Sequence, residues 1–398
     1  MTCMTKNNAW RRVAALALAL VLALPPALTL AADRSEIDAQ VDRIFRNGKT
    51  TGGSVIIARH GEIVYARDYG MKDVRRRLPV DERTFFRLNS VTKMVSGMGA
   101  LQLVEQGLLD LDADISDYYG YRIVNPHAKG TPLTLRQAMS HTLGLNENSG
   151  YSSIRSTVYS MLSADSKKKS NFLPHAPGSR YAYSNFGAGL VGSMMEAVTG
   201  VSVNRYMADH VFSPLGIEAA YSASLLANPE DVPGLYRNGK LYRAAGNYTG
   251  ETYEDFADPE RHYRTTIYDL WIRSRDLAKI AILLCGDGSY QGIELLSPAT
   301  IDMMRQDQSS LGKSVTGASP YGLFLERNTF LLPGRTIYGH QGMGKNAIQN
   351  VYFDPETQFV FVLLTNGCSL KRDNRVGVLA LNMFRYLYPI FTEEQLLP

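Results

Sequence analysis

The sequence is poor in cysteine and has no pair of histidines at metal-binding spacing. Three cysteines occur in 398 residues, and Cys3 lies at the extreme N-terminus. This number is too small for a disulfide-based scaffold. None of the seven histidines forms a His-x-x-x-His pair, so the sequence predicts no metal site and no cofactor. Cys285 and Cys368 are expected either to form a single disulfide in an oxidising compartment or to remain two buried thiols.

An excess of one charge is also missing from most of the chain. Three of the 42 basic residues, and no acidic residue, lie in positions 1–32, which leaves 39 basic against 38 acidic residues in the remainder. A near-neutral chain lacks the basic field that recruits nucleic acid, so we expect no nucleic-acid partner.

The first 32 residues have the organisation of a targeting segment. Basic residues are followed by an apolar run over 13–24, then by two prolines and small residues. This order is typical of a secretory signal peptide with cleavage after Ala31 or Ala32. An uncleaved anchor is the alternative, but the prolines shorten the apolar helix below the ~20 residues of a membrane span. We therefore expect a periplasmic or secreted protein that consists of residues 33–398, with no stable membrane span after cleavage.

Hydrophobic periodicity places strands at both ends of this mature chain and helices between them. The β-rich runs are 54–58, 63–66, 335–338, 347–353 and 359–365. The helical patterns are 35–47, 90–107, 135–141, 188–198, 205–211 and 376–387. The arrangement predicts an α+β fold with one antiparallel sheet made from N- and C-terminal segments and flanked by helices. A helical region of roughly 90–265 is inserted, and its part 228–265 is predicted to be an irregular lid or rim.

The strongest chemical signal is a serine followed three residues later by a lysine. Residues three apart on a helix are neighbours, so the lysine amine can reach the serine hydroxyl and activate it as a nucleophile. Three such pairs occur: Ser90 with Lys93, Ser166 with Lys169, and Ser310 with Lys313. Ser90 opens an apolar-periodic helix, whereas the other two serines lie in polar stretches that are typical of surfaces. Ser90 and Lys93 are therefore the candidate nucleophile and base.

Two further motifs supply candidate partners for this pair. In Tyr183-Ser184-Asn185 a phenol and an amide can point into the same cleft, where they would relay a proton and hold a substrate amide. In His340-Gln341-Gly342 the histidine can donate to a substrate carboxylate. The glycine there allows close approach of the backbone, and the N–H of the following Met343 can point at a developing oxyanion.

The three motifs in this order resemble those of the serine β-lactamase and penicillin-binding protein family, which includes class C β-lactamases and D-alanyl-D-alanine carboxypeptidases. The resemblance also covers the segments 86–93, 135–145, 177–187, 214–216 and 354–356. Class C β-lactamases usually have Lys-Thr-Gly as their third motif, and here a histidine takes the place of that lysine. The chain therefore looks more like the carboxypeptidase and esterase side of the family. Lys345 is out of register and is expected to be a surface residue.

This resemblance implies acyl transfer through a covalent intermediate on a single catalytic domain, 33–398. Ser90 attacks the carbonyl, and Lys93 or Tyr183 takes the first proton, a choice that the sequence leaves open. Backbone N–H groups of Ser90 and Met343 form the oxyanion hole. Asn185 holds the substrate amide, and His340 with Gln341 faces the carboxylate end of the substrate.

The expected activity is that of a carboxypeptidase-like peptidase acting on a small peptide, amide or ester, including the peptidoglycan stem peptide. Esterase, D-aminopeptidase, acyltransferase and weak β-lactamase activities on the same machinery are alternatives. The alternative outside enzymes is a penicillin-binding sensor or scaffold, which is expected to have lost the serine, lysine or tyrosine. All three residues are present here.

Overall fold

The structure is a computed structural model that describes residues 34–153, 155–166, 168–308 and 321–392. The predicted signal peptide and the Ser310 to Lys313 pair lie outside these residues. The chain divides into two units, Met1–Ala39 and Gln40–Pro398. The second unit contains every candidate site residue. Helix α2 (Arg34–Asn47), predicted from its apolar spacing, runs across the boundary between the two units.

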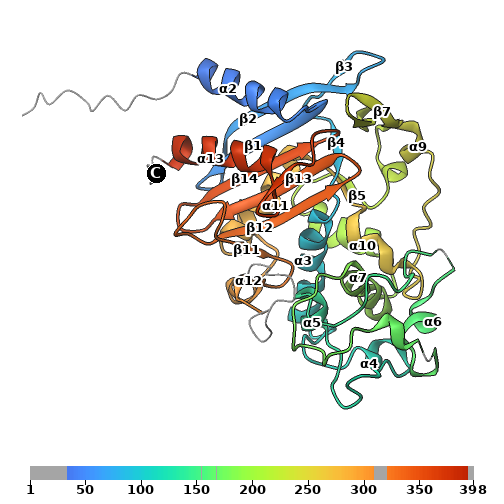
Figure 1. The fold of residues 1–398 in the computed structure, drawn as a ribbon. Coiled ribbons are helices and arrows are strands. Elements are labelled where there is room, and N and C mark those ends of the chain that lie inside the picture. Colours follow the sequence, from blue (N-terminus) through green and yellow to red (C-terminus); the bar gives the residue numbers. More distant parts are fainter. Residues whose placement is uncertain (1–33, 154, 167, 309–320, 393–398) are drawn as a thin grey trace, which may run out of the picture. The chain divides into compact units, whose positions relative to one another are not determined.

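The centre of the second unit is a seven-stranded sheet in the order β11-β12-β13-β14-β1-β2-β3, with all neighbouring strands antiparallel (Figure 1). Its strands are β1 (Gly52–Arg59), β2 (Glu62–Asp73), β3 (Leu78–Pro79), β11 (Glu326–Asn328), β12 (Ile337–Gly344), β13 (Ala347–Asp354) and β14 (Phe359–Thr365). N-terminal β1 pairs with C-terminal β14, so the predicted sheet of N- and C-terminal segments is confirmed.

Alternation along the strands explains why helices cover both faces of this sheet. Val360, Val362 and Leu364 of β14 join the large hydrophobic core, to which α11 (Ser274–Cys285) contributes. The intervening Phe359 and Phe361 contact the ring of Phe384 in α13 (Val378–Thr392) on the opposite face. A strand that is buried on both faces has a continuous apolar sequence instead of an alternating one. The sequence over 359–365 has this character.

The predicted helical region is confirmed in outline. Its helices are α3 (Val91–Glu105), α4 (Ser116–Tyr119), α5 (Leu135–Met139), α6 (Val158–Leu162), α7 (Asn185–Thr199), α8 (Val203–Met207), α9 (Gly246–Thr249) and α10 (Thr265–Tyr268). Short 3-10 or π turns are η1 (Ala164–Ser166), η2 (Lys169–Asn171), η3 (Ala208–Phe212), η4 (Ala223–Leu225), η5 (Pro229–Asp231) and η6 (His262–Arg264).

Short strands also occur in and beside this region, where the sequence predicted helices and loops. They are β4 (Phe85–Arg87), β5 (Ala219–Ala220), β6 (Leu235–Arg237), β7 (Lys240–Arg243), β8 (Trp271–Arg273), β9 (Ser289–Tyr290), β10 (Ile293–Glu294), β15 (Arg372–Asp373) and β16 (Val376–Gly377). The sheet β4-β8-β5 was not predicted, because strands of two or three residues carry too little periodicity to be recognised. Helix α12 (Pro298–Arg305) completes the fold.

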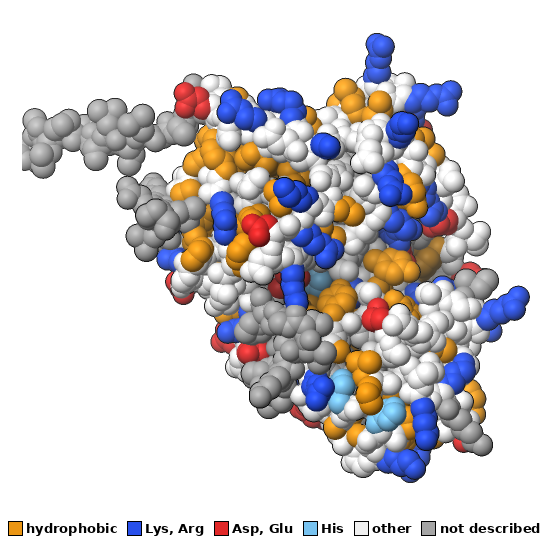
Figure 2. Space-filling model, in the orientation of Figure 1, with side chains coloured by type: hydrophobic (Ala, Val, Ile, Leu, Met, Phe, Trp, Pro, Cys, Tyr) orange, Lys and Arg blue, Asp and Glu red, His pale blue; other side chains and the backbone are white. Residues whose placement is uncertain are grey.

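The structure can also be compared with three other expectations from the sequence, on the cysteines, the membrane spans and the charge. Cys285 and Cys368 are separate, buried free thiols, so of the two alternatives the second is observed. Among the described residues no single helix is long and apolar enough to cross a membrane, and one sharply bent pair, Asn185–Thr199 with Val203–Phe212, passes that test only when its parts are combined. Basic, acidic and hydrophobic side chains are interspersed on the face shown in Figure 2.

Candidate active site

Ser90 lies where a strand turns sharply into a buried helix. Strand β4 ends at Arg87, the Leu88 N–H donates to the Leu270 carbonyl at 2.8 Å, and α3 begins at Val91. Asn89 completes the turn in the left-handed region, with φ of 51°, which asparagine tolerates better than most residues. Ser90 is the N-cap of α3, so its backbone N–H is one of the unpaired donors at the helix start. The predicted helix start is confirmed.

Lys93 is buried completely on the first turn of α3. Its Nζ donates to Ser90 Oγ at 3.2 Å and to the Ile267 carbonyl oxygen at 2.9 Å. Burial lowers the pKa of Lys93 from 10.5 to about 7, and the negative charge of Glu147 acts in the opposite direction. A substantial fraction of the amine is therefore unprotonated at neutral pH, which a general base requires.

Tyr183 lies over this pair. Its phenol interacts with the Ser90 side chain, its ring centroid is 5.3 Å from Lys93 Nζ, and its ring lies against that of His141 with centroids 4.2 Å apart. The side chain is 36 % exposed, so one part of it faces solvent. Burial of the rest raises the pKa of Tyr183, and the phenol keeps its proton at neutral pH. The structure thus brings together the three residues that the sequence singled out.

Asn185 is the first residue of α7, and its side chain is held by Glu147. The N-cap Ser184 accepts from the Gly187 N–H. Both carboxylate oxygens of Glu147 accept hydrogen bonds of 2.9–3.2 Å. Oε1 accepts from Ser184 Oγ and the Phe186 N–H, and Oε2 accepts from Asn185 Nδ2 and the Tyr151 hydroxyl. Glu147 therefore fixes the start of α7 and the orientation of the Asn185 amide.

The third motif forms part of strand β12. Gly342 lies directly against the nucleophile turn, because a Cβ at this position would be 2.4 Å from the Leu88 carbonyl oxygen and 2.9 Å from the Ser90 nitrogen. The Gln341 N–H donates to Glu326 Oε1 at the outer edge of the strand. Since N–H groups two residues apart on a strand point to the same edge, the Met343 N–H also points outward from β13. Gly342 thus lies beside Ser90, and the Met343 N–H points to the same edge of β12 as the Gln341 N–H.

His340 differs from its predicted role. Its side chain is only 1 % exposed, and its ring packs edge-on against Tyr321 instead of facing open cleft. The Nδ1–H donates to the Gln341 carbonyl at 2.8 Å, and burial with the nearby Lys93 charge lowers the pKa of His340 to about 3. The ring is neutral and buried, so the prediction that it donates to a substrate carboxylate does not fit this structure. Alternation along β12 turns this side chain toward the core, opposite to Gln341.

Four functional neighbours were missed from the sequence: His141, Glu147, Ile267 and Glu326. His141 belongs to a segment that was noted for its family resemblance, but its packing on Tyr183 was not anticipated. Ile267 contributes a backbone carbonyl, for which no side-chain pattern exists. The two glutamates come from segments without recognisable periodicity, and only the folded chain brings them to the site.

Neither the Ser166 to Lys169 pair nor Lys345 is part of the site. Ser166 ends η1 and Lys169 begins η2, so no helix joins them. Lys345 is exposed at the turn between β12 and β13, as expected for a surface residue. Among the described residues, Ser166 is therefore excluded as an alternative to Ser90 for the nucleophile.

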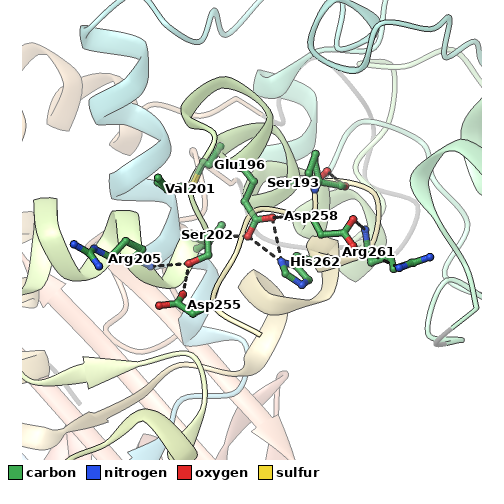
Figure 3. A network of polar contacts seen from close by, with 12 residues as sticks. Ser193, Glu196, Val201, Ser202, Arg205, Asp255, Asp258, Arg261 and His262 are labelled. Atoms are coloured by element: carbon green, nitrogen blue, oxygen red, sulfur yellow. Dashed lines mark hydrogen bonds and ion pairs between the residues drawn. The ribbon is translucent and has the colours of Figure 1, made fainter. Parts of the chain in front are cut away.

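The irregular stretch 251–265 is tied to α7 by a polar network (Figure 3). Glu196, 1 % exposed, accepts from the Asp258 N–H at 2.7 Å and lies 3.2 Å from His262 Nδ1. Ser202 Oγ hydrogen-bonds the Asp255 carboxylate. This rim borders a cavity of about 750 Å³, whose aromatic lining comprises Tyr221, Tyr248, Tyr253, Tyr268 and Trp271. The chain passes directly from the rim to Ile267, the Lys93 partner.

Replacing Gly342 with alanine is expected to lower kcat/KM by about 100-fold. The new Cβ would push β12 away from Ser90. A displacement of about 1 Å in a catalytic site can lower the rate by this factor. Gly344→Ala is the matched control, since its Cβ would meet no heavy atom closer than 3.7 Å. Steady-state kinetics and thermal melting of both variants test this. Equal activities of the two variants would show that the close approach at Gly342 is not needed.

Known proteins resemble this chain in sequence and in fold. Esterase EstB of Burkholderia gladioli is 30 % identical over 225 residues, 52 % of this chain and 55 % of the esterase. The chain spans about half the length of EstB and 37 % of other curated relatives that it matches.

Two solved structures show the same fold. The octameric penicillin-binding protein homologue of Pyrococcus abyssi has a TM-score of 0.70 at 21 % identity, covering 92 % of this chain and 79 % of its own. The D-alanine carboxypeptidase AmpC of Burkholderia cenocepacia has a TM-score of 0.65 at 18 % identity, covering 91 % and 99 %. The family model described as Beta-lactamase matches residues 37–380. This match covers most of the sequence, and the chain belongs to the Beta-lactamase family of serine hydrolases.

Proposed function

We propose that the protein hydrolyses an ester or amide through an acyl-enzyme on Ser90. The observation that carries the proposal is the contact between Lys93 Nζ and Ser90 Oγ at 3.2 Å, made by a lysine whose burial lowers its pKa to about 7. A neutral amine beside a hydroxyl is the arrangement that activates a serine nucleophile.

The first step forms the bond between Ser90 Oγ and the substrate carbonyl carbon, and the serine proton moves to Lys93 Nζ. Lys93 is the better candidate for this proton than Tyr183, because the pKa of the tyrosine is raised and its phenol is already protonated. The oxyanion accepts hydrogen bonds from the Ser90 and Met343 N–H groups, each worth on the order of 3 kcal/mol of barrier.

In the second step the leaving alcohol or amine departs with a proton from the Tyr183 phenol, which Lys93 restores. Water then attacks the acyl-enzyme carbonyl and loses its proton to the same Lys93–Tyr183 pair. The bond between Ser90 Oγ and the carbonyl carbon breaks, the pair returns this proton to Ser90 Oγ, and the acid leaves. The exposed part of Tyr183 supports this role, because a proton donor to the leaving group must reach the cleft.

The substrate that we favour is an ester or an uncharged amide. The sequence predicted a D-alanyl-D-alanine carboxypeptidase-like peptidase whose substrate carboxylate lies against His340 and Gln341. Buried His340 is unsuited to this task, and both Gln341 nitrogens are 3.4 Å from Glu326 oxygens. A carboxylate of the protein itself therefore occupies the neighbourhood of the expected substrate carboxylate. The EstB relationship also supports the ester proposal.

Trapping the acyl-enzyme tests this function. Purified protein is mixed with a p-nitrophenyl ester, quenched within the first turnover and analysed by intact mass and peptide mapping. We expect an acyl group on Ser90 and a rate that increases as pH rises through about 7, where Lys93 loses its proton. If Ser90 never acquires an acyl group from esters, D-Ala-D-Ala peptides or a β-lactam, the acyl-enzyme proposal is wrong.

We also propose that the protein is exported, on the order of charged, apolar and small residues in positions 1–32. The mass of the mature protein from cells that carry the full gene tests this. Cleavage after Ala31 or Ala32 is expected, and an intact N-terminus in the cytoplasm would contradict it.

A further inference from the structure

Glu326 occupies a specific place on the outer edge of β12. It is the first residue of β11, and β11 pairs with β12 over Ile337 to Gly339. Beyond that point the edge is covered first by the Glu326 carboxylate, which accepts from the Gln341 N–H and Nε2 at 3.4 Å each. The next residue of β12, Gly342, lies against the nucleophile turn. The carboxylate is therefore bound to the residue of β12 that directly precedes the contact with the nucleophile turn.

The groups that face Glu326 leave its charge without a cationic partner. Burial raises the pKa values of four tyrosines from separate segments, and the negative charge of Glu326 adds to the rise: Tyr181, Tyr183, Tyr321 and Tyr352. In the part of the chain that the structure describes, no lysine, arginine or histidine forms an ion pair with Glu326. Two cations act on these tyrosines, since Lys93 lies against the Tyr183 ring and Arg375 acts on Tyr181.

The state of this carboxyl changes near neutral pH. Burial raises the pKa of Glu326 to about 7, opposed by the two hydrogen bonds from Gln341. Above that pH the group is an anion that accepts hydrogen bonds, and below it the group is neutral. Glu147, the other carboxylate of the site, accepts hydrogen bonds from four donors and fixes the start of α7.

We propose that Glu326 is a specificity-determining residue that makes the site reject substrates with a negative charge on the leaving group and accept neutral or cationic ones. This inference rests on the acyl-enzyme function proposed above. Its physical basis is that two like charges in a partly desolvated cleft repel strongly, whereas an opposite or absent charge carries no such penalty. The site would thus serve esters and amides of neutral or amine-bearing leaving groups.

The test compares three phenyl esters of the same acyl group, with a carboxylate, a carboxamide or a trimethylammonium group at the meta position of the leaving phenol. At pH 8 we expect wild-type kcat/KM for the carboxylate ester to be about tenfold or more below that for the carboxamide ester, with the cationic ester at least equal to the latter. The penalty should shrink as pH falls below about 7.

Glu326→Gln keeps the shape of the side chain and removes its charge. Relative to the wild type at pH 8, it should raise the kcat/KM of the carboxylate ester about tenfold compared with that of the carboxamide ester, and remove the pH dependence of this ratio. Glu294→Gln, on the exposed hairpin strand β10, is the control and should keep the wild-type ratios.

Equal wild-type rates on the three esters at pH 8, or ratios unchanged in Glu326→Gln, would overturn the role of Glu326 while leaving the acyl-enzyme intact. Absence of Ser90 acylation by all three esters would instead refute the proposed function. Because the wild-type ratios and their pH dependence are informative without any variant, a poorly folded Glu326→Gln would still leave a decisive measurement.

Discussion

Replacing Ser90 with alanine is expected to lower kcat for a p-nitrophenyl ester by about 10⁵-fold, because the covalent intermediate can no longer form. The small residual rate would come from binding and from the oxyanion donors. The fold should persist, since the Ser90 side chain does not cap α3 and the buried face of that helix is unaffected. Burst kinetics and the mass of the trapped adduct measure the effect, and circular dichroism checks the fold.

Ser166→Ala is the control for this experiment. It changes the serine of a second Ser-x-x-Lys sequence, in the short turn η1 where no helix aligns serine with lysine. Its activity should match that of the wild type. If Ser90→Ala retained near-normal turnover while Ser166→Ala lost it, the assignment of the nucleophile would be wrong.

Replacing Lys93 with methionine is expected to lower kcat/KM by about 10³-fold and to remove the rise in rate near pH 7, because the general base is lost. The methionine side chain has nearly the length of lysine and suits a buried position. Full pH–rate profiles of both proteins measure this. A variant with lower rate but an unchanged rise near pH 7 would show that another group is the base.

The same substitution should change how stability depends on pH. The folded pKa of Lys93 is lowered, so between about 7 and 10.5 the unfolded chain binds more protons and the free energy of unfolding increases with pH. The total change is on the order of 5 kcal/mol. Lys93→Met should flatten this increase in thermal melts.

Lys72→Met provides the contrast. Lys72 is buried too, but its Nζ is paired with Asp231 at 2.9 Å. Loss of this partner leaves a buried carboxylate uncompensated, and we expect a loss of about 3 kcal/mol with the rise in rate near pH 7 preserved.

The sheet and the nucleophile helix could be predicted because each carries a local pattern. The apolar runs over 54–58 and 359–365 indicate strands wherever they pair, and α3 shows as a long stretch of mostly apolar and small residues from Val91 onward, nearly all of which are buried. The structure of the stretch 228–265 could not be predicted in the same way. Its turns are held by distant partners such as Glu196, whose contacts with Asp258 and His262 cross more than 60 residues of sequence.

In the candidate site, too, the residues with a local sequence pattern could be predicted, and those placed by strand pairing could not. The spacing of Ser90 and Lys93 is set by one helical turn, so sequence suffices to predict their contact. The inward turn of His340 depends on the register of β12 with β13, where His340 pairs with Val351, and a shift of one residue would reverse it. The carboxyl of Glu326 reaches the site through pairing with β12, which nothing in its own neighbourhood of the sequence indicates.

The path from the rim to Ile267 has a consequence for how such an enzyme can diversify. Three features of the site lie within residues 262–268. His262 contacts Glu196, Tyr268 lines the wall of the cavity, and the Ile267 carbonyl accepts a hydrogen bond from Lys93. A change that remodels the wall would therefore also move the carbonyl acceptor that orients the Lys93 amine. We expect that a graft of the rim from a relative has to extend through Ile267 and include Glu196 if the amine is to stay in place.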